Sequence, residues 1–160
     1  MTIAVGDKIP SAKLKTMTAE GPKDISTDEI FGGKKVVLFA LPGAFTPTCS
    51  AKHLPGFVEK AAQIKDKGVA TIACLAVNDA FVMGAWGKQQ NTDGKVLMLA
   101  DGSATFTKQL GLELDLTGPG MGIRSKRYAM VVDNGVVKAL NVEAPGAFEV
   151  SSADAILKAL

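Results

Sequence analysis

The chain has 160 residues, of which 47% are hydrophobic and 21% charged, and its 18 basic and 16 acidic residues leave a formal net charge of +2. This composition is typical of one globular domain and excludes a disordered or fibrous chain. The charges are scattered, so the sequence lacks the basic surface of proteins that bind nucleic acids or membranes. We therefore expect a single soluble domain over residues 1–160, with no nucleic-acid or membrane partner.

The sequence also bears on the compartment. Residues 1–14 lack the apolar core of a secretory signal, and the uncharged stretch 36–51 is too short and too interrupted by proline to span a bilayer. Cys49 and Cys74 form neither a CxxC pair nor a zinc-ligand spacing, which favours a reducing compartment and no metal. We predict a cytoplasmic protein, or an organellar one if a targeting peptide preceded Met1.

Strand-like and helix-like segments alternate along the chain, separated by glycine and proline. The predicted strands are residues 36–40, 69–77, 96–100, 128–133 and 136–142. Three of them are nearly continuous apolar runs, which is typical of strands covered on both faces. The last two flank Asn134–Gly135, a strong hairpin signal, so the sheet should be mixed with an antiparallel end.

Helices are predicted between these strands and at the end of the chain. One helix has its apolar residues on a single stripe: Leu54, Phe57, Val58, Ala61 and Ala62. Phe81 and Trp86 suit the packing face of another helix, and Ser151–Ser152 suits the N-cap of a last one. This order of elements predicts an α/β fold, a thioredoxin-like three-layer sandwich with a mixed central sheet.

The segment most informative about chemistry is residues 41–50, which leaves a predicted buried strand and enters a helix. Thr46 followed by Pro47 is typical of an N-cap and a first helical position. Cys49 is then near the third position, where free N–H groups and the helix dipole should stabilise a thiolate. On an ideal helix Cys49 lies about 150° from the apolar stripe, so we expect it to point away from the core, although Pro55 can kink the helix. This favours a reactive thiol over one that only packs.

Pro42, Thr46 and Cys49 match the PxxxTxxC active-site motif of the peroxiredoxins. The run PGAFTPTC over residues 42–49, followed by HLPGF over 53–57, resembles the type II or peroxiredoxin-5 subfamily. The resemblance to this subfamily recurs in residues 77–82, 99–101 and 127–133. The resemblance covers nearly the whole chain. It implies a thiol-dependent peroxidase that reduces hydrogen peroxide and alkyl hydroperoxides in antioxidant defence and redox homeostasis.

The resemblance also implies a role for each site residue. Cys49 attacks the terminal peroxide oxygen and becomes a sulfenic acid. Thr46 holds the peroxide through its hydroxyl, and Pro42 shields the site from water. Arg127 is a fixed cation that stabilises the thiolate and the charge on the departing oxygen. Arg124 is a weaker candidate for this role, and we expect it to be a solvated loop charge.

Other features are interpreted as structural. Cys74 lies in an apolar run, where packing is the expected role and a central strand should hold it apart from Cys49. His53 lies on the same helical face as Cys49, which leaves a Cys–His hydrolase pair as an alternative, but we favour a contribution to local electrostatics. The glycine-rich segment 118–122 lacks the context of a nucleotide loop, so we interpret it as a mobile connection and predict no cofactor.

The resemblance finally bears on how the sulfenic acid is reduced. Some relatives carry a second cysteine near the C-terminal end, where this sequence has Ser151, and a hydroxyl cannot form a disulfide. We therefore expect a one-cysteine cycle served by an external thiol, glutathione with glutaredoxin first and thioredoxin second. We also expect a homodimer, since residues 42–45 offer apolar atoms beside the site. A redox sensor or holdase that uses Cys49 as a switch, and a disulfide exchanger of the thioredoxin type, remain as alternatives.

Overall fold

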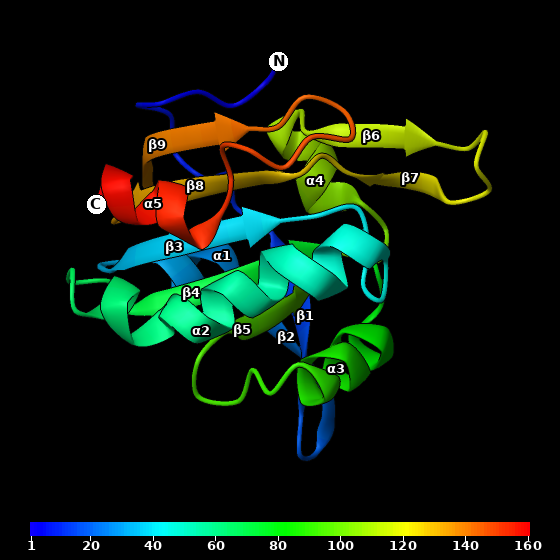
Figure 1. Ribbon diagram of the computed structural model, residues 1–160, viewed down its shortest axis with the longest axis horizontal. Helices are drawn as coiled ribbons and strands as arrows, with labels where there is room; N and C mark the ends of the chain where they lie inside the picture. Colours follow the sequence, from blue (N-terminus) through cyan, green and yellow to red (C-terminus); the bar gives the residue numbers. More distant parts are fainter.

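A seven-stranded mixed sheet forms the middle of the protein in the computed structural model, which describes all 160 residues (Figure 1). The strands of this sheet are β1 (Lys13–Thr18), β2 (Gly21–Ser26), β3 (Lys35–Ala40), β4 (Thr71–Ala76), β5 (Leu97–Ala100), β8 (Tyr128–Asp133) and β9 (Val136–Val142). A separate hairpin consists of β6 (Glu113–Leu116) and β7 (Gly122–Ser125). The helices are α1 (Thr27–Phe31), α2 (Leu54–Lys65), α3 (Ala80–Gln89), α4 (Thr105–Leu110) and α5 (Ala153–Ala159), with a π-helix, η1 (Cys49–His53), directly before α2.

The order of strands across the sheet is β2-β1-β5-β4-β3-β8-β9. β3, β4 and β5 are parallel to one another, whereas β8 and β9 continue the sheet as an antiparallel end. The turn between β8 and β9 is formed by Asn134 and Gly135, with φ angles of 48° and 79°, the left-handed geometry that a two-residue hairpin needs. The predicted thioredoxin-like fold with a mixed central sheet is confirmed.

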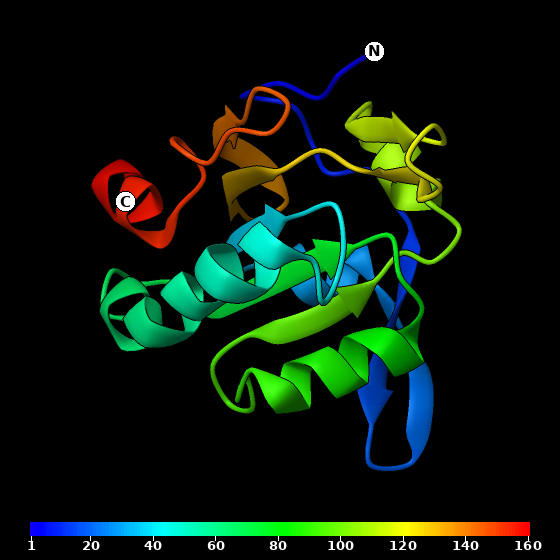
Figure 2. The same ribbon diagram turned by 45° about the vertical axis from the view of Figure 1, so that its right-hand side comes forward.

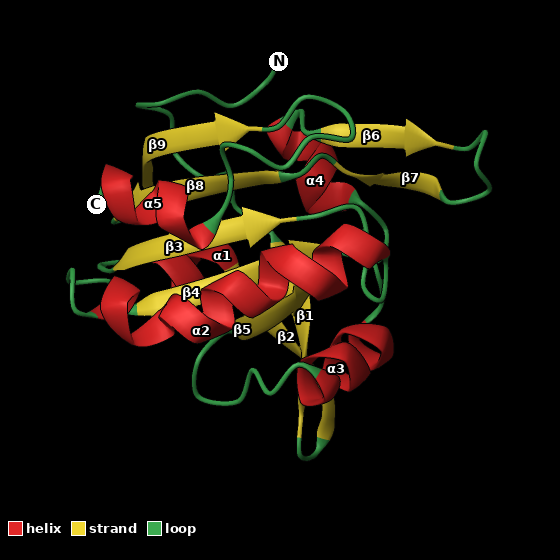
Figure 3. Cartoon of the chain, viewed as in Figure 1, coloured by secondary structure: helices red, strands yellow, loops and turns green.

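Two apolar cores lie on the two faces of the sheet, because successive side chains of a strand point to opposite sides. In β3, Val37 and Phe39 belong to the core under α2, α3 and α5, whereas Val36 and Leu38 belong to the core under α1 and α4. The helices in front of and behind the sheet are separated clearly in Figures 2 and 3. β3 is therefore buried on both sides, as its continuous apolar run predicts.

The elements that the sequence did not indicate are short or polar. β1 and β2 form an edge hairpin in which Leu14 is the one fully buried side chain. The glycine-rich segment 118–122, interpreted as a mobile connection, belongs to the turn between β6 and β7, and Gly122 already begins β7. No helix of the protein has both the length and the apolar character required to cross a bilayer.

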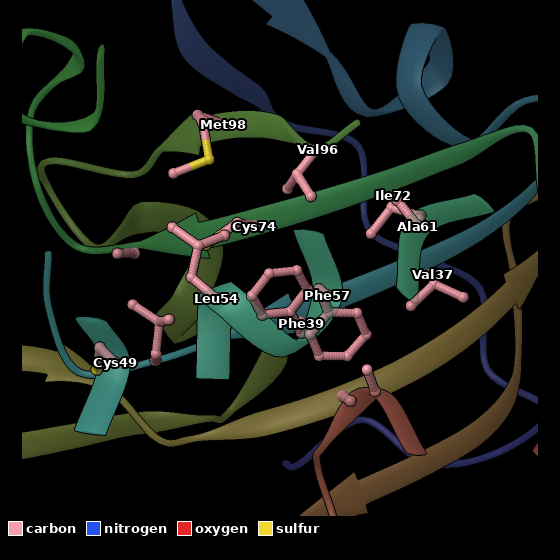
Figure 4. Packing of buried hydrophobic residues seen from close by; sticks show 14 of the residues in the cluster. Val37, Phe39, Cys49, Leu54, Phe57, Ala61, Ile72, Cys74, Val96 and Met98 are labelled. Atoms are coloured by element: carbon pink, nitrogen blue, oxygen red, sulfur yellow. The ribbon is translucent and has the colours of Figure 1, made fainter. Parts of the chain in front are cut away.

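One aromatic contact anchors α2 to the strand that leads into the candidate site. The rings of Phe39 in β3 and Phe57 in α2 are stacked, with centroids 3.9 Å apart and planes 6° from parallel. Both side chains are fully buried, and Figure 4 shows them at the centre of the core beneath α2. This stack fixes the helix relative to the end of β3.

We expect Phe57→Ala to lower the free energy of unfolding by about 3–5 kcal/mol, because it removes the stacked ring and leaves a cavity in a close-packed core. Glu59→Ala is the matched control, since Glu59 lies on the same helix with an exposed side chain, and it should change stability by less than about 0.5 kcal/mol. Chemical denaturation with circular dichroism measures both. Equal effects of the two substitutions would contradict this account of the core.

Candidate active site

The helix that carries Cys49 begins where the sequence predicts. Pro47 and Thr48 form its first helical positions, and the carbonyl of Thr46 accepts a hydrogen bond from the N–H of Ser50 at 2.9 Å. Thr46 is thus the residue at the helix start, but its hydroxyl donates to the carbonyl of Gly43 at 2.8 Å instead of capping an N–H group. Cys49 occupies the predicted third position.

The expectation that Cys49 points away from the core is wrong. Its side chain is fully buried and belongs to the core under α2 (Figure 4). The reason is the π-helix, in which the N–H of Leu54 bonds to the carbonyl of Cys49. Proline at position 55 has no N–H and its ring crowds the carbonyl four residues earlier, so a wider turn relieves the conflict. One extra residue in a turn changes the phase by about 100°, which carries Cys49 toward the apolar stripe.

The loop from β3 to the helix is fixed by side chains from distant segments. Asn78, which follows β4, accepts a hydrogen bond from the N–H of Ala44 at 2.9 Å. Arg124 in β7 donates to the carbonyl of Pro42 at 3.1 Å and to that of Met121 at 2.9 Å. Arg124 is therefore half-buried and bonded, not the solvated loop charge that was predicted.

The hydrogen bond from Arg124 to the carbonyl of Pro42 favours glycine at position 43. A Cβ atom at Gly43 would lie 2.5 Å from Nη1 of Arg124, which is closer than the two atoms can approach. The glycine thus lets the guanidinium of Arg124 reach the backbone of the loop. Phe45, two residues later, adopts a positive φ of 65°, and 51% of its side chain is exposed.

Arg127 reaches the sulfur of Cys49 directly. It lies just before β8, and its Nη2 donates to Sγ of Cys49 at 3.2 Å. An arginine is charged at any physiological pH, so a permanent cation faces the thiol. Arg127 and Cys49, which the sequence analysis assigns to one site, are thus in direct contact. Pro42 and Thr46 lie in the loop that leads into the helix carrying Cys49.

His53 lies on the other side of the same guanidinium. Nη1 of Arg127 is 2.9 Å from Nδ1 of His53, and Nε2 of His53 is 2.9 Å from the carbonyl of Ser151. Since arginine only donates and a carbonyl only accepts, Nδ1 must carry the lone pair and Nε2 the proton. Burial, reinforced by the charge of Arg127, lowers the pKa of His53 to about 3 against the opposing effects of Ser151 and Glu143. His53 is therefore a neutral imidazole that accepts from Arg127.

Glu143, which follows β9, holds the segment that contains Ser151. Its carboxylate accepts hydrogen bonds from the N–H groups of Glu149, Val150 and Ser151, and from the hydroxyl of Ser151 at 2.7 Å. Burial alone would raise the pKa of Glu143, but these hydrogen bonds outweigh it and the pKa is lowered. The carboxylate thus stays charged and fixes the backbone that His53 contacts.

Cys74 lies in β4, the central strand of the sheet, and is fully buried. Burial, with a further contribution from Cys49, raises the pKa of the Cys74 thiol well above its usual value, and Arg127 offsets this only in part. Both cysteines are free thiols of one apolar core, on different elements (Figure 4). Packing is confirmed as the environment of Cys74.

A cleft of about 170 Å³ opens beside Arg127. It is lined by Pro42, Thr48, Leu114, Lys126, Arg127, Glu143 and residues 144–147. A larger and more open hollow, of about 520 Å³, runs along α2 and contains none of the residues at Cys49. The cleft therefore lies beside Arg127, whose guanidinium contacts the buried sulfur of Cys49.

Two residues of the site were missed in the sequence. Asn78 enters the sequence analysis only within residues 77–82, which resemble the subfamily, and no role is predicted for Glu143. Their partners are backbone groups far along the chain, at Ala44 and Ser151. Sequence periodicity carries no signal for such contacts, because they join groups that are far apart along the chain.

The comparisons with known proteins agree with this geometry. The Redoxin family model matches residues 4–157. Peroxiredoxin-2B of Arabidopsis thaliana is 52% identical, covering 99% of this chain and 98% of the relative, and chloroplastic Peroxiredoxin-2E-2 of Oryza sativa subsp. japonica is 55% identical, covering 99% and 73%. The structure of reduced Prx3 from Vibrio vulnificus in complex with H2O2 has a TM-score of 0.95 at 59% identity, with 99% of each chain covered. This chain therefore belongs to the Redoxin family and, within it, to the type II peroxiredoxins, which reduce peroxides with thiols.

Proposed function

We propose that Cys49 is the nucleophile of this peroxidase and that Arg127, Thr46 and Pro42 complete its site. The observation that carries the proposal is the 3.2 Å contact between Nη2 of Arg127 and Sγ of Cys49 at the start of a helix. A fixed cation and a helix N-terminus both favour the thiolate, which is the reactive form of cysteine. Hydrogen peroxide as a substrate is further supported by the H2O2 complex of the Vibrio vulnificus relative.

The reaction is a displacement at oxygen. The thiolate of Cys49 forms a bond to the terminal peroxide oxygen while the O–O bond breaks, and the departing oxygen takes a proton and leaves as water or an alcohol. The hydroxyl of Thr46 donates its only hydrogen bond to the carbonyl of Gly43. Its oxygen can therefore accept a hydrogen bond from the peroxide. Arg127 faces both the sulfur and the cleft, where it can stabilise the charge that develops on the departing oxygen.

We propose that an external thiol then reduces the sulfenic acid. The thiol sulfur attacks the sulfenic sulfur and water leaves, which gives a mixed disulfide that a second thiol resolves. Ser151 stands where some relatives have a resolving cysteine, and its hydroxyl is committed to Glu143. Cys74 is buried in the central strand with a raised pKa, which disfavours the thiolate needed for attack. Glutathione with glutaredoxin is our first choice of donor and thioredoxin the second.

We further propose that the 160 residues act as one domain, in a homodimer, in a reducing compartment with the cytoplasm as the first choice. Phe45 and Phe81 support the dimer, since these large apolar side chains are 51% and 68% exposed, and exposed apolar surface marks interfaces. The packing role expected for Phe81 is therefore wrong, whereas Trp86 of the same helix is fully buried as expected. Two free thiols support a reducing compartment. The chloroplastic name of the rice relative makes an organelle the second choice.

We expect Cys49→Ser to reduce steady-state peroxidase activity by at least about a thousandfold, because a hydroxyl cannot replace the thiolate. Cys74→Ser is the matched control and should retain activity within about threefold, since its position serves packing. Hydrogen peroxide consumption with glutathione and glutaredoxin, or with thioredoxin, measures both. Retention of most activity by Cys49→Ser would contradict the assignment, and absence of turnover in the parent would favour the sensor.

One equivalent of peroxide should add a single oxygen, about 16 daltons, to the intact protein through the sulfenic acid of Cys49. In the presence of glutathione the product should be one glutathione adduct at Cys49. Intact mass spectrometry followed by peptide mapping identifies both. An intramolecular Cys49–Cys74 disulfide that forms as fast as turnover would contradict the one-cysteine cycle.

Light scattering at high protein concentration should report twice the chain mass of 16.6 kDa. Phe81→Ser should shift the equilibrium toward the monomer, because it removes a large exposed apolar side chain from the proposed contact surface. Val5→Ser is the matched control: Val5 is 60% exposed in the N-terminal segment, across the molecule from α3 (Figure 1). A strict monomer in the parent protein would exclude the dimer.

A further inference from the structure

We propose that His53 is a positioning residue that fixes the guanidinium of Arg127 against the sulfur of Cys49. This inference rests on the proposed roles of Cys49 and Arg127. It assigns His53 neither proton transfer nor contact with peroxide. The geometry that carries it is a chain of contacts from Glu143 through the backbone of Ser151 to His53, and from His53 through Arg127 to the sulfur.

The two terminal nitrogens of Arg127 have different partners. Nη1 donates to Nδ1 of His53 at 2.9 Å, and Nη2 donates to Sγ of Cys49 at 3.2 Å. A guanidinium is planar and rigid, so fixing one terminal nitrogen sets the direction of the other. Without an acceptor at His53, the long arginine side chain would sample several rotamers, and the nearby cleft offers it space and water.

His53 is itself held from every side. Nε2 bonds to the carbonyl of Ser151, and the ring lies 5.1 to 5.7 Å, between centroids, from three phenylalanine rings. These rings are Phe39, Phe57 and Phe148. This apolar cage excludes water and favours the neutral imidazole, so the lone pair of Nδ1 stays available to Arg127. A Cys–His hydrolase pair is excluded by the same geometry, because that lone pair is already occupied.

Glu143 extends the arrangement to the backbone. Its carboxylate binds three successive N–H groups from Glu149 to Ser151, which sets the direction of the Ser151 carbonyl. Its own N–H donates to the carbonyl of Arg127 at 2.9 Å. Glu143 thus fixes the backbone of Arg127 directly. Through Ser151 and His53 it also fixes the guanidinium of Arg127.

Three substitutions at His53 separate this role from a merely structural one. Asn places an oxygen near the position of Nδ1 and keeps the acceptor for Arg127, whereas Gln reaches Ser151 but loses that acceptor. Leu fills the space and keeps neither hydrogen bond. The proposal therefore predicts that function decreases in the order parent, Asn, Gln, Leu, while packing alone would favour Leu over the shorter Asn in this aromatic cage.

The experiment uses the full chain in a Cys74→Ser background, so that Cys49 is the only thiol. The second-order rate constant with hydrogen peroxide and the pH midpoint of Cys49 alkylation by iodoacetamide are measured for each variant. We expect His53→Leu to lower the rate constant about tenfold or more, as for a lost charge-assisted hydrogen bond. The alkylation midpoint should move to higher pH, and His53→Asn should recover most of both effects.

Lys52→Ala is the control. Lys52 is an exposed neighbour of His53 in the same helical segment, so this variant should react within about twofold of the parent. Glu143→Gln is the second test if a His53 variant fails to fold, and it should slow the reaction with peroxide and raise the alkylation midpoint. Unchanged rates and midpoints in folded His53→Leu, or in Glu143→Gln, overturn the proposal. Loss of the proposed function would appear differently, as an inactive parent or an active Cys49→Ser.

Discussion

The contact between Arg127 and the sulfur of Cys49 is the constraint on which the rest of the site depends. A cation beside a fully buried thiol is useful only if it cannot turn away into solvent, because the nearby cleft would hydrate it better than sulfur does. The fold therefore fixes Arg127 at two places, at its carbonyl by Glu143 and at its side chain by His53. Strands β8 and β9 are neighbours in the sheet, which brings Glu143 opposite Arg127 without any long loop.

The helix start shows how a local distortion serves this contact. A regular helix would turn Cys49 away from the core, and the π-helix before Pro55 turns it inward. Because η1 spans Cys49 to His53, the widened turn sets the direction of both residues that Arg127 contacts. Ser50, in the same turn, accepts hydrogen bonds from Trp86 in α3 and from Gln90 directly after α3, which connects the turn to that helix. π-Helical turns are frequent at functional sites, and here the cause is a proline two residues beyond the turn.

Most of the central sheet could be predicted from the sequence, since β3, β4, β5, β8 and β9 are apolar runs of the expected length. The predicted strands 128–133 and 136–142 coincide with β8 and β9, whereas 69–77 is longer than β4, whose ends lie at Thr71 and Ala76. The sequence did not predict β1 and β2, the hairpin at one edge of the sheet, because these strands are largely exposed and contain few apolar residues. The PxxxTxxC motif points to Pro42, Thr46 and Cys49, and the wider resemblance points to Arg127, but neither indicates that Cys49 is buried or that Glu143 supports the site. The burial of Cys49 depends on the wider turn before Pro55, and the contacts of Glu143 are with backbone groups distant in sequence.

Ser151 links the architecture of the site to the proposed choice of reductant. Its hydroxyl donates to the carboxylate of Glu143 at 2.7 Å, and its carbonyl accepts from His53 at 2.9 Å. A thiol is a weaker donor than a hydroxyl, so a cysteine at this position would hold Glu143 less firmly. A cysteine there would also have to leave its buried place to reach the sulfenic sulfur, and that movement would release the carbonyl from His53 and loosen Arg127. A serine at this position makes both contacts, and in the proposed one-cysteine cycle the reducing thiol therefore comes from another molecule.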